Sequence, residues 1–400
     1  MVRKSAMRVL GVLVLLLSGA SCSLTDDSAD VPELVVAATL ELTGSLADVG
    51  NAHQRALRLQ EEQINASGVL GERRLRVVIR DNQSNPELAV NQISDFAGDS
   101  SVSAIISGAC SRCALNGTKV ANEKQVPLIS LAPSTRVAAR GADTPERNFV
   151  FKIGANGTDS VRALLDEIVP DAAPANAPPR RLAVLYPDDD YGTDGYAALT
   201  TAIANSGAVM AGDAKYRADG SNLKDQAASL VAGKSTSQRP EAVLVFALPP
   251  QTGPAAQALK AAGFQGDQVY YDSAAAGGLF LSEPAVEGAT IVFSQTLAMD
   301  DVIASTPAKA NRKQWFEDFT SRYGAYHGQA SFAADALSAV ATAFDRGETT
   351  NRVQLCDVLE SMENDGLSGP LRMTPLNHSA LMPQALETLV AKGGRWRLLG

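Results

Sequence analysis

Short apolar runs rich in β-branched residues alternate with amphipathic stretches from residue 34 onward. The runs have the length of strands, and they lie at 34–40, 75–81, 103–108, 127–132, 182–187, 242–248 and 269–273. Within 89–97, between the second and third run, apolar residues fall at positions i, i+4, i+7 and i+8, which is the spacing of one helix face. Strands that alternate with helices are typical of parallel sheets with crossover helices, so the pattern predicts an α/β fold.

The pattern runs through the chain twice. It stops before Phe149 and begins again at 182–187, with further helices expected around 196–203 and 255–262. A Pro/Ala-rich segment at 170–181 precedes the first strand of the second unit and is typical of a surface loop. A chain of 400 residues is long enough for two such units, each with its own core. We therefore expect two Rossmann-like lobes with parallel sheets flanked by helices.

The first residues follow a different pattern. In 1–22, three basic residues precede an apolar stretch at 9–17, which is the layout of an export signal. That stretch is about half the ~20 residues of a membrane-spanning helix. The small residues Gly-Ala-Ser before Cys22 resemble the bacterial lipoprotein box, in which this cysteine is diacylated; the alternative is a plain secretory signal with an incidental cysteine. Residues 23–32 are small and acidic, as expected of a flexible tether.

The charge balance argues against one class of partner. Without residues 1–22, the chain has 32 basic and 44 acidic residues, a net charge of −12. Nucleic acid is therefore not expected as a partner.

Three cysteines remain after the signal, and two of them share the stretch GACSRCALNGT at 108–118. Cys110 and Cys113 have the C-x-x-C spacing of a redox pair or of half a zinc site. A zinc site needs two more ligands, and the three histidines of the chain are scattered singly. An exported protein reaches an oxidising compartment, which favours a structural disulfide between Cys110 and Cys113. Cys356 would then be left as a free or buried thiol. No metal or cofactor is expected.

Two adjacent strand ends carry hydroxyl groups. Ser111 follows the strand at 103–108, and Pro133, Ser134 and Thr135 follow the strand at 127–132. A helix that starts after the first loop leaves backbone N–H groups free to bind a carboxylate. Because ligands of open α/β sheets gather at the carboxyl ends of the strands, the two loops predict one site for a small molecule with a carboxylate or amide.

Several segments together resemble the type I periplasmic binding proteins, in particular the branch that binds leucine, isoleucine and valine, and the amide-binding relatives that serve ABC importers. The segments, in order, are LELTGSLADVG (40–50), EQINASGVLGERRLRVV (62–78), RDNQSNPELAV (80–90), ACSRC, APST, DDDYGTDGY (188–196) and ALKAAGF (258–264). Their order and spacing carry the resemblance.

The resemblance implies a division of the chain and a set of ligand contacts. Lobe one would comprise 33–152 plus 276–382 and lobe two 153–275 plus 383–400, joined by three crossings of the chain. In lobe one, Ser111 and the loop from Pro133 to Thr135 would hold the ligand. The residues expected to close over the ligand from lobe two are Tyr191, Asp272 and Ser273.

The sequence also departs from the amino-acid-binding pattern. Leu248 or Pro249 stands where a tyrosine is usual, Ser273 aligns with the usual glutamate, and the cysteine partner near Asn85 is missing. The ligand is therefore not restricted to a free α-amino acid. Asp272 has two alternative roles: it balances a ligand ammonium, or it caps the start of a helix.

Other classes of function have weaker support. The three aspartates at 188–190 lack the following glutamate and alternating oxygens of a calcium loop, so an acidic turn at the cleft rim is expected. Ser111 has no His/Asp partner identifiable from the sequence, and no nucleophile-elbow or phosphate-loop motif is present, so no enzyme is expected. The sequence favours an extracytoplasmic binding lipoprotein that delivers its ligand to an ABC permease; the alternative is a ligand-sensing receptor module that regulates a signalling partner.

Overall fold

The computed structural model describes residues 33–140, 147–169, 178–204, 206–277 and 282–399. The predicted signal at 1–22, the tether at 23–32 and the lipidation site Cys22 lie outside the described residues. Among the helices that the structure does describe, none has both the length and the apolar character that crossing a membrane requires.

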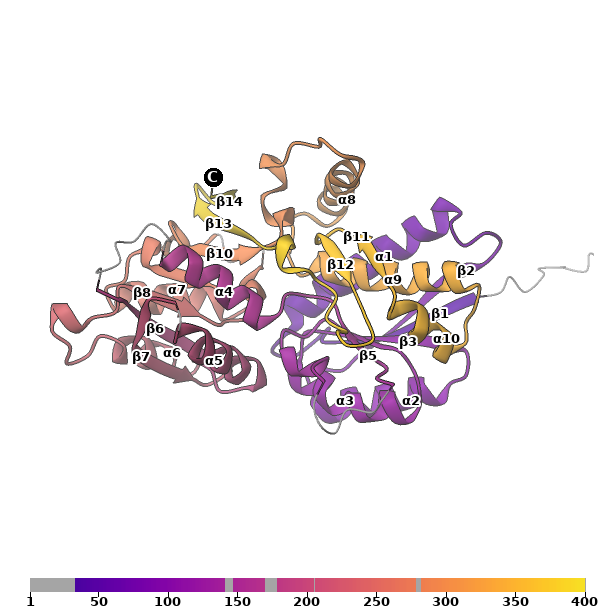
Figure 1. Ribbon diagram of the computed structural model, residues 1–400, viewed down its shortest axis with the longest axis horizontal. Coiled ribbons are helices and arrows are strands. Elements are labelled where there is room, and N and C mark those ends of the chain that lie inside the picture. Colours follow the sequence, from indigo (N-terminus) through magenta and orange to yellow (C-terminus); the bar gives the residue numbers. More distant parts are fainter. Residues whose placement is uncertain (1–32, 141–146, 170–177, 205, 278–281, 400) are drawn as a thin grey trace, which may run out of the picture. The chain divides into compact units, whose positions relative to one another are not determined.

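The first half of the chain forms a parallel five-stranded sheet with the order β2-β1-β3-β4-β5 (Figure 1). Its strands are β1 (Glu33–Leu40), β2 (Arg74–Asp81), β3 (Val102–Ser107), β4 (Leu128–Ser130) and β5 (Val150–Lys152). The helices between them are α1 (Ala47–Ser67), α2 (Pro86–Gly98) and α3 (Ser111–Glu123). We call this sheet and the helices packed on it lobe one.

Strand β1 is buried along nearly its whole length because both faces of its sheet are covered. Val36 and Ala38 belong to one core cluster, while Val35 and Ala37 belong to another that includes residues of α2 and α3. Successive residues of a strand point to opposite faces, so a continuous apolar run is what a doubly covered strand needs. The apolar runs in the sequence reflect this burial.

The second half of the chain repeats the plan in a seven-stranded sheet with the order β14-β13-β10-β9-β8-β6-β7. Its strands are β6 (Arg180–Pro187), β7 (Ala208–Tyr216), β8 (Ala242–Val245), β9 (Val269–Tyr271), β10 (Thr290–Phe293), β13 (Glu387–Lys392) and β14 (Arg395–Leu398). Its helices are α4 (Gly157–Ile168), α5 (Asp190–Ile203), α6 (Leu223–Ser229) and α7 (Thr252–Ala261). We call this sheet with its helices lobe two.

Strands β6 to β10 are parallel and follow the same order as β1 to β5, which confirms the prediction of two similar α/β units. The sequence analysis did not predict β13 and β14, which add to β10 as an antiparallel hairpin at the edge of the otherwise parallel sheet (Figure 1). Gly393 and Gly394, with φ of 62° and 71°, form the two-residue turn of this hairpin. Two consecutive positive φ values match the twist of paired strands, and glycine adopts them without strain.

One predicted lobe boundary is also wrong. The resemblance implies that residues 276–382 belong to lobe one, but β10 at Thr290–Phe293 pairs with β9 in the sheet of lobe two. The chain therefore returns to lobe one after β10 and not at residue 276. The four-residue strand carries too few positions for its sheet to be identified from periodicity, and only pairing with β9 assigns it.

The remaining elements lie between β10 and β13. They are α8 (Pro307–Tyr323), α9 (Ala330–Gly347), α10 (Arg352–Leu359) and the antiparallel pair β11 (Glu363–Asp365) and β12 (Pro370–Arg372). Helices α8 and α9 both contact α1 of lobe one, and α9 is buried on most of its surface.

Sheet order also identifies where a ligand would bind. In lobe one the chain moves from β1 to β2 on one side and to β3 on the other, so the order reverses between β1 and β3. In lobe two the same reversal falls between β6 and β8. The loops that leave the carboxyl ends of these strands form the crevice in which open α/β sheets bind ligands.

Candidate functional site

In lobe one, the two predicted ligand loops are bonded to each other. Ser111 is the first residue of α3, and Ser134 and Thr135 follow β4 at the start of a short 3₁₀ helix, η1 (Thr135–Val137). The Ser134 backbone N–H donates to Ser111 Oγ over 3.3 Å. Both serines are buried, so these two strand ends form one continuous wall.

The backbone N–H groups before α3 are not all free, contrary to the expectation that they bind a ligand carboxylate. The carboxylate of Glu41, which directly follows β1, accepts from the N–H groups of Ala109 (2.9 Å) and Cys110 (3.4 Å). Asn82 Nδ2 donates to the same carboxylate over 3.1 Å. A Cβ on Gly108 would lie 2.1 Å from Glu41 Oε2, so this glycine permits the approach. A carboxylate of the chain itself therefore occupies this part of the predicted cradle.

Glu41 is fully buried, and burial raises the pKa of its carboxyl group while the hydrogen bonds from Asn82, Ala109 and Cys110 oppose that rise. Sequence reasoning missed this residue. The available signal was an acidic residue immediately after a buried strand, within LELTGS.

The Cys110–Cys113 disulfide is present, as predicted. Cys110 is the N-cap of α3, and its Sγ accepts from the Cys113 backbone N–H over 3.1 Å. Cys356 is a buried free thiol, which agrees with the prediction, and burial raises its pKa to about 12. Among the described residues, Glu41 with these two cysteines is the one group of three possible metal ligands, and its sulfurs are bonded to each other.

In lobe two, Tyr191 and Asp272 form a buried pair. The Tyr191 hydroxyl donates to the Asp272 carboxylate, and its ring packs edge-on against Phe246, with centroids 5.9 Å apart. Burial raises the pKa of Asp272 to about 7 and, together with the negative charge of Asp272, raises that of Tyr191 well above its usual value. Asp272 is the N-cap residue of the 3₁₀ helix η4 (Ser273–Ala275), where its carboxylate forms no cap bond within hydrogen-bond geometry, although the nearby Ala274 N–H lowers its pKa.

Two further predicted ligand residues, Thr135 and Ser273, form hydrogen bonds with the first turn of α4. The Gly157 backbone N–H donates to Thr135 Oγ1 over 3.1 Å, and the Ser160 hydroxyl donates to Ser273 Oγ over 3.2 Å. Thr135 belongs to lobe one and Ser273 to lobe two, so the first turn of α4 contacts predicted ligand residues of both lobes.

These residues surround one small cavity between the lobes. Its volume is about 10 Å³, room for about one water molecule. Five of the seven predicted ligand residues line it, namely Pro133, Thr135, Tyr191, Asp272 and Ser273. Ser111 and Ser134 do not line this cavity, but the bond between them joins the Pro133–Thr135 loop to the start of α3.

A second cavity, of about 90 Å³, lies beside the first and shares Tyr191 with it. Ser45 and Leu46 line it from lobe one, and Leu248 and Pro249 from lobe two. The position where the related proteins are expected to carry a tyrosine therefore does face the cleft, but with an apolar side chain.

Lys152, at the end of β5, is a buried charge that sequence reasoning missed. Its Nζ donates to the carbonyl oxygens of Gly154 (3.1 Å) and Ala155 (2.6 Å). Burial lowers its pKa to about 7, against the attraction of Asp159 and Asp272. A lysine within a short apolar strand, VFK, was the available signal.

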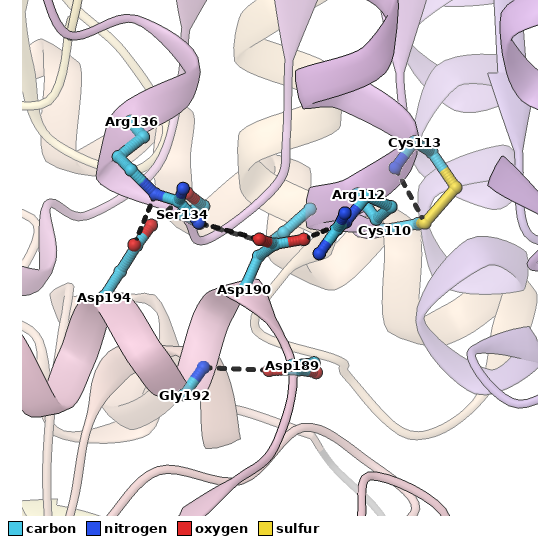
Figure 2. Close-up of polar contacts among 10 residues, drawn as sticks. Cys110, Arg112, Cys113, Ser134, Arg136, Asp189, Asp190, Gly192 and Asp194 are labelled. Atoms are coloured by element: carbon cyan, nitrogen blue, oxygen red, sulfur yellow. Dashed lines mark hydrogen bonds and ion pairs between the residues drawn. A yellow bond between two sulfur atoms is a disulfide. The ribbon is translucent and has the colours of Figure 1, made fainter.

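The three aspartates at 188–190 have separate structural partners, which supports the acidic turn over a calcium loop. Asp188 accepts from the Ala218 N–H (2.9 Å), and Asp189 caps α5 by accepting from the Gly192 N–H (2.8 Å). Asp190 forms ion pairs with Arg112 and Arg136 of lobe one (Figure 2).

A family model described as periplasmic binding protein matches residues 33–394. The chain belongs to this family. The match covers both lobes and confirms the resemblance inferred from the sequence.

Solved structures agree on the fold. An extracellular ligand-binding receptor from Rhodopseudomonas palustris HaA2 is 20% identical with a TM-score of 0.79, covering 92% of this chain and 99% of that one. A leucine-binding protein from Thermotoga maritima MSB8 is 18% identical with a TM-score of 0.74, covering 92% and 98%. A possible leucine/isoleucine/valine-binding protein from Rhodopirellula baltica SH 1 is 16% identical with a TM-score of 0.76, covering 93% and 97%. The type I periplasmic binding protein fold is thereby confirmed.

Proposed function

We propose that this periplasmic binding protein captures a small polar molecule between its lobes and delivers it, chemically unchanged, to an ABC permease. The observation that carries the proposal is the meeting of five predicted ligand residues, from both lobes, around one cavity. Relatives described as a leucine-binding protein and a possible leucine/isoleucine/valine-binding protein share the fold and support a ligand the size of an amino acid. Such a ligand is larger than the cavity of about 10 Å³, so the lobes would have to separate to admit it.

The polar groups of the site favour a ligand with a carboxylate or an amide. Thr135 offers a hydroxyl group to the cavity from lobe one, and Tyr191, Asp272 and Ser273 line it from lobe two. Ser111 lies outside the cavity, where its hydroxyl accepts from the Ser134 N–H. Glu41 already bonds to the N–H groups of Ala109 and Cys110, so these two groups are not free to bind a ligand carboxylate. Recognition of the ligand therefore depends more on the hydroxyl groups. Asp272 would balance an ammonium if the ligand carries one.

Calorimetry tests the proposal with a panel of branched-chain amino acids, short amides and aromatic acids. Ser111→Ala and Thr135→Ala should each weaken a bound member by about tenfold, because removing one hydroxyl from a dry site leaves its partner unpaired. Thr200→Ala, an exposed hydroxyl on α5, is the matched control and should leave affinity unchanged. A ligand whose affinity ignores both loop substitutions, or a panel with no binder, would contradict the proposed site.

We further propose that the protein is exported and anchored through diacylated Cys22. Cys22→Ala should move it from the membrane to the soluble exported fraction, because a two-chain anchor is lost with that one side chain. The control variant Cys356→Ala, which changes a buried cysteine outside the anchor, should remain in the membrane fraction. Unchanged membrane retention of the Cys22→Ala protein would contradict the anchor.

A ligand-sensing receptor module would use the same cleft. The Rhodopseudomonas palustris relative, described as an extracellular ligand-binding receptor, is the observation that keeps this second candidate. Uptake of the ligand distinguishes the two candidates, measured in vesicles that contain the permease and ATPase encoded beside this protein. Uptake that requires this protein supports transport. Ligand binding without such uptake supports a receptor.

A further inference from the structure

Two arginines of lobe one face two aspartates of lobe two across the rim of the site (Figure 2). Arg112 lies in the first turn of α3, and its guanidinium pairs with Asp190. Arg136, in η1, pairs with Asp190 (2.8 Å) and with Asp194 (2.5 Å). Both aspartates lie near the start of α5, about one helical turn apart on the same face.

The two sides of this cluster differ in exposure. The side chains of Asp190 and Asp194 are 12% and 13% exposed, whereas those of Arg112 and Arg136 are 61% and 52% exposed. The carboxylates have therefore lost most of their water, and cations from the opposite lobe replace it. Such a cluster is stronger than isolated surface ion pairs, because one carboxylate binds both arginines.

The cluster also contacts the predicted ligand loop of lobe one. The Ser134 hydroxyl donates to the Asp194 carboxylate, so lobe two holds the predicted ligand loop of lobe one. Asp194 borders the site cavity, but Arg112, Arg136 and Asp190 do not line it. Substituting these three residues changes contact between the lobes without removing a group that lines the cavity.

We propose that Arg112, Arg136, Asp190 and Asp194 form an interlobe clasp that holds the lobes together in the absence of ligand. The clasp is electrostatic, so salt weakens it, and a ligand enters when it opens. It makes closure of the lobes partly independent of the ligand, and it positions the Pro133–Thr135 loop whenever the lobes meet. It goes beyond the proposed function and does not depend on what the ligand is.

Spin labels on the full chain test the clasp without any ligand. Labelled cysteines would replace the exposed residues Lys119, on α3 of lobe one, and Thr200, on α5 of lobe two, and pulsed electron resonance would give the distribution of distances between them. At low salt the unsubstituted protein should show a main short-distance population. Molar salt should reduce it, because ion pairs with exposed arginines are screened.

The double variant Arg112→Gln/Arg136→Gln should lower the ratio of short to long distances about tenfold at low salt and lose the salt dependence, since about three ion pairs are removed together. Asp190→Asn, which removes the partner shared by both arginines, should act in the same direction. Arg76→Gln is the matched control: Arg76 pairs with Glu33 inside lobe one and is 48% exposed, close to the 52% of Arg136, and its loss should leave the distances unchanged.

The clasp is refuted if the double variant and Asp190→Asn keep the distance distribution of the unsubstituted protein, or if no short-distance population exists at low salt. It is also refuted if salt shifts the double variant as much as the unsubstituted protein. Because no ligand is present, a failed clasp leaves the proposed binding function standing, and a failed ligand panel leaves the clasp standing.

Discussion

The two walls of the cleft satisfy their polar groups in different ways. On the lobe one side, Glu41 bonds to Asn82 and to N–H groups of the same lobe, and Ser134 bonds to Ser111. On the lobe two side, Asp190 is balanced by arginines of the other lobe, and Asp272 is buried beside Tyr191.

The difference indicates which wall satisfies its polar groups without the other lobe. Lobe one needs no partner to satisfy the loop before α3, so that loop is fixed as soon as its sheet forms. Lobe two carries carboxylates that are costly to bury without a donor or a cation. Its rim therefore depends on contact with the other lobe, whereas the loop before α3 does not.

The largest expected effect comes from breaking the self-contained wall at Glu41. Glu41→Ala leaves the buried N–H of Ala109 without an acceptor and removes one of the two acceptors of the Asn82 amide, the other being Thr39 Oγ1, which should lower the free energy of unfolding by about 2–4 kcal/mol. Glu41→Gln keeps one acceptor oxygen and should lose less. Urea unfolding measures both. Equal stability of Glu41→Ala and the unsubstituted protein would show that this wall does not depend on the carboxylate.

A pH titration sharpens the comparison on the lobe two side. The ordinary pKa of Asp272 is 3.8, and burial raises it to about 7 in the folded protein. A raised folded pKa contributes stability that is present below pH 4 and is lost as pH rises through 7. Relative to Asp272→Asn, the unsubstituted protein should therefore lose roughly 1.4 kcal/mol of unfolding free energy for each pH unit within that window.

Urea unfolding between pH 4.5 and 8.5 checks this difference. Tyr191→Phe is the companion variant: the tyrosine hydroxyl lowers the pKa of Asp272, so its removal should move the loss of stability to higher pH. A difference between the unsubstituted protein and Asp272→Asn that stays constant with pH would mean that Asp272 ionises normally.

The smallest effect is expected from the disulfide. Cys110→Ser/Cys113→Ser opens a loop of only a few residues, so unfolding free energy should fall by about 1 kcal/mol, below the range for longer loops. Alkylation without reduction, followed by peptide mapping, checks the pairing. Cys110 and Cys113 should resist alkylation, and Cys356 should react only after unfolding because it is buried. A bond from either loop cysteine to Cys356 would contradict the structure.

Much of the fold follows from local patterns in the sequence. The apolar runs predicted β1, β3, β6 and β8 to within a few residues, because strands covered on both faces need continuous apolar side chains. They also predicted the edge strand β2, whose residues are more exposed. Strand β7 was missed since its residues are only partly buried, and β5 and β10 because three or four residues carry no period.

The sequence by itself determined the two repeated units and the strand ends where polar residues collect. Five of its seven ligand candidates line one cavity because parallel strands bring their carboxyl ends to one edge of a sheet. Tertiary structure decided what those residues bond to. Glu41 reaches the loop at Ala109 across 68 residues, and Asp194 reaches Ser134 across 60. Such bonds depend on how β1 lies beside β3 and on how the lobes meet, and neither arrangement leaves a period or a spacing in the chain.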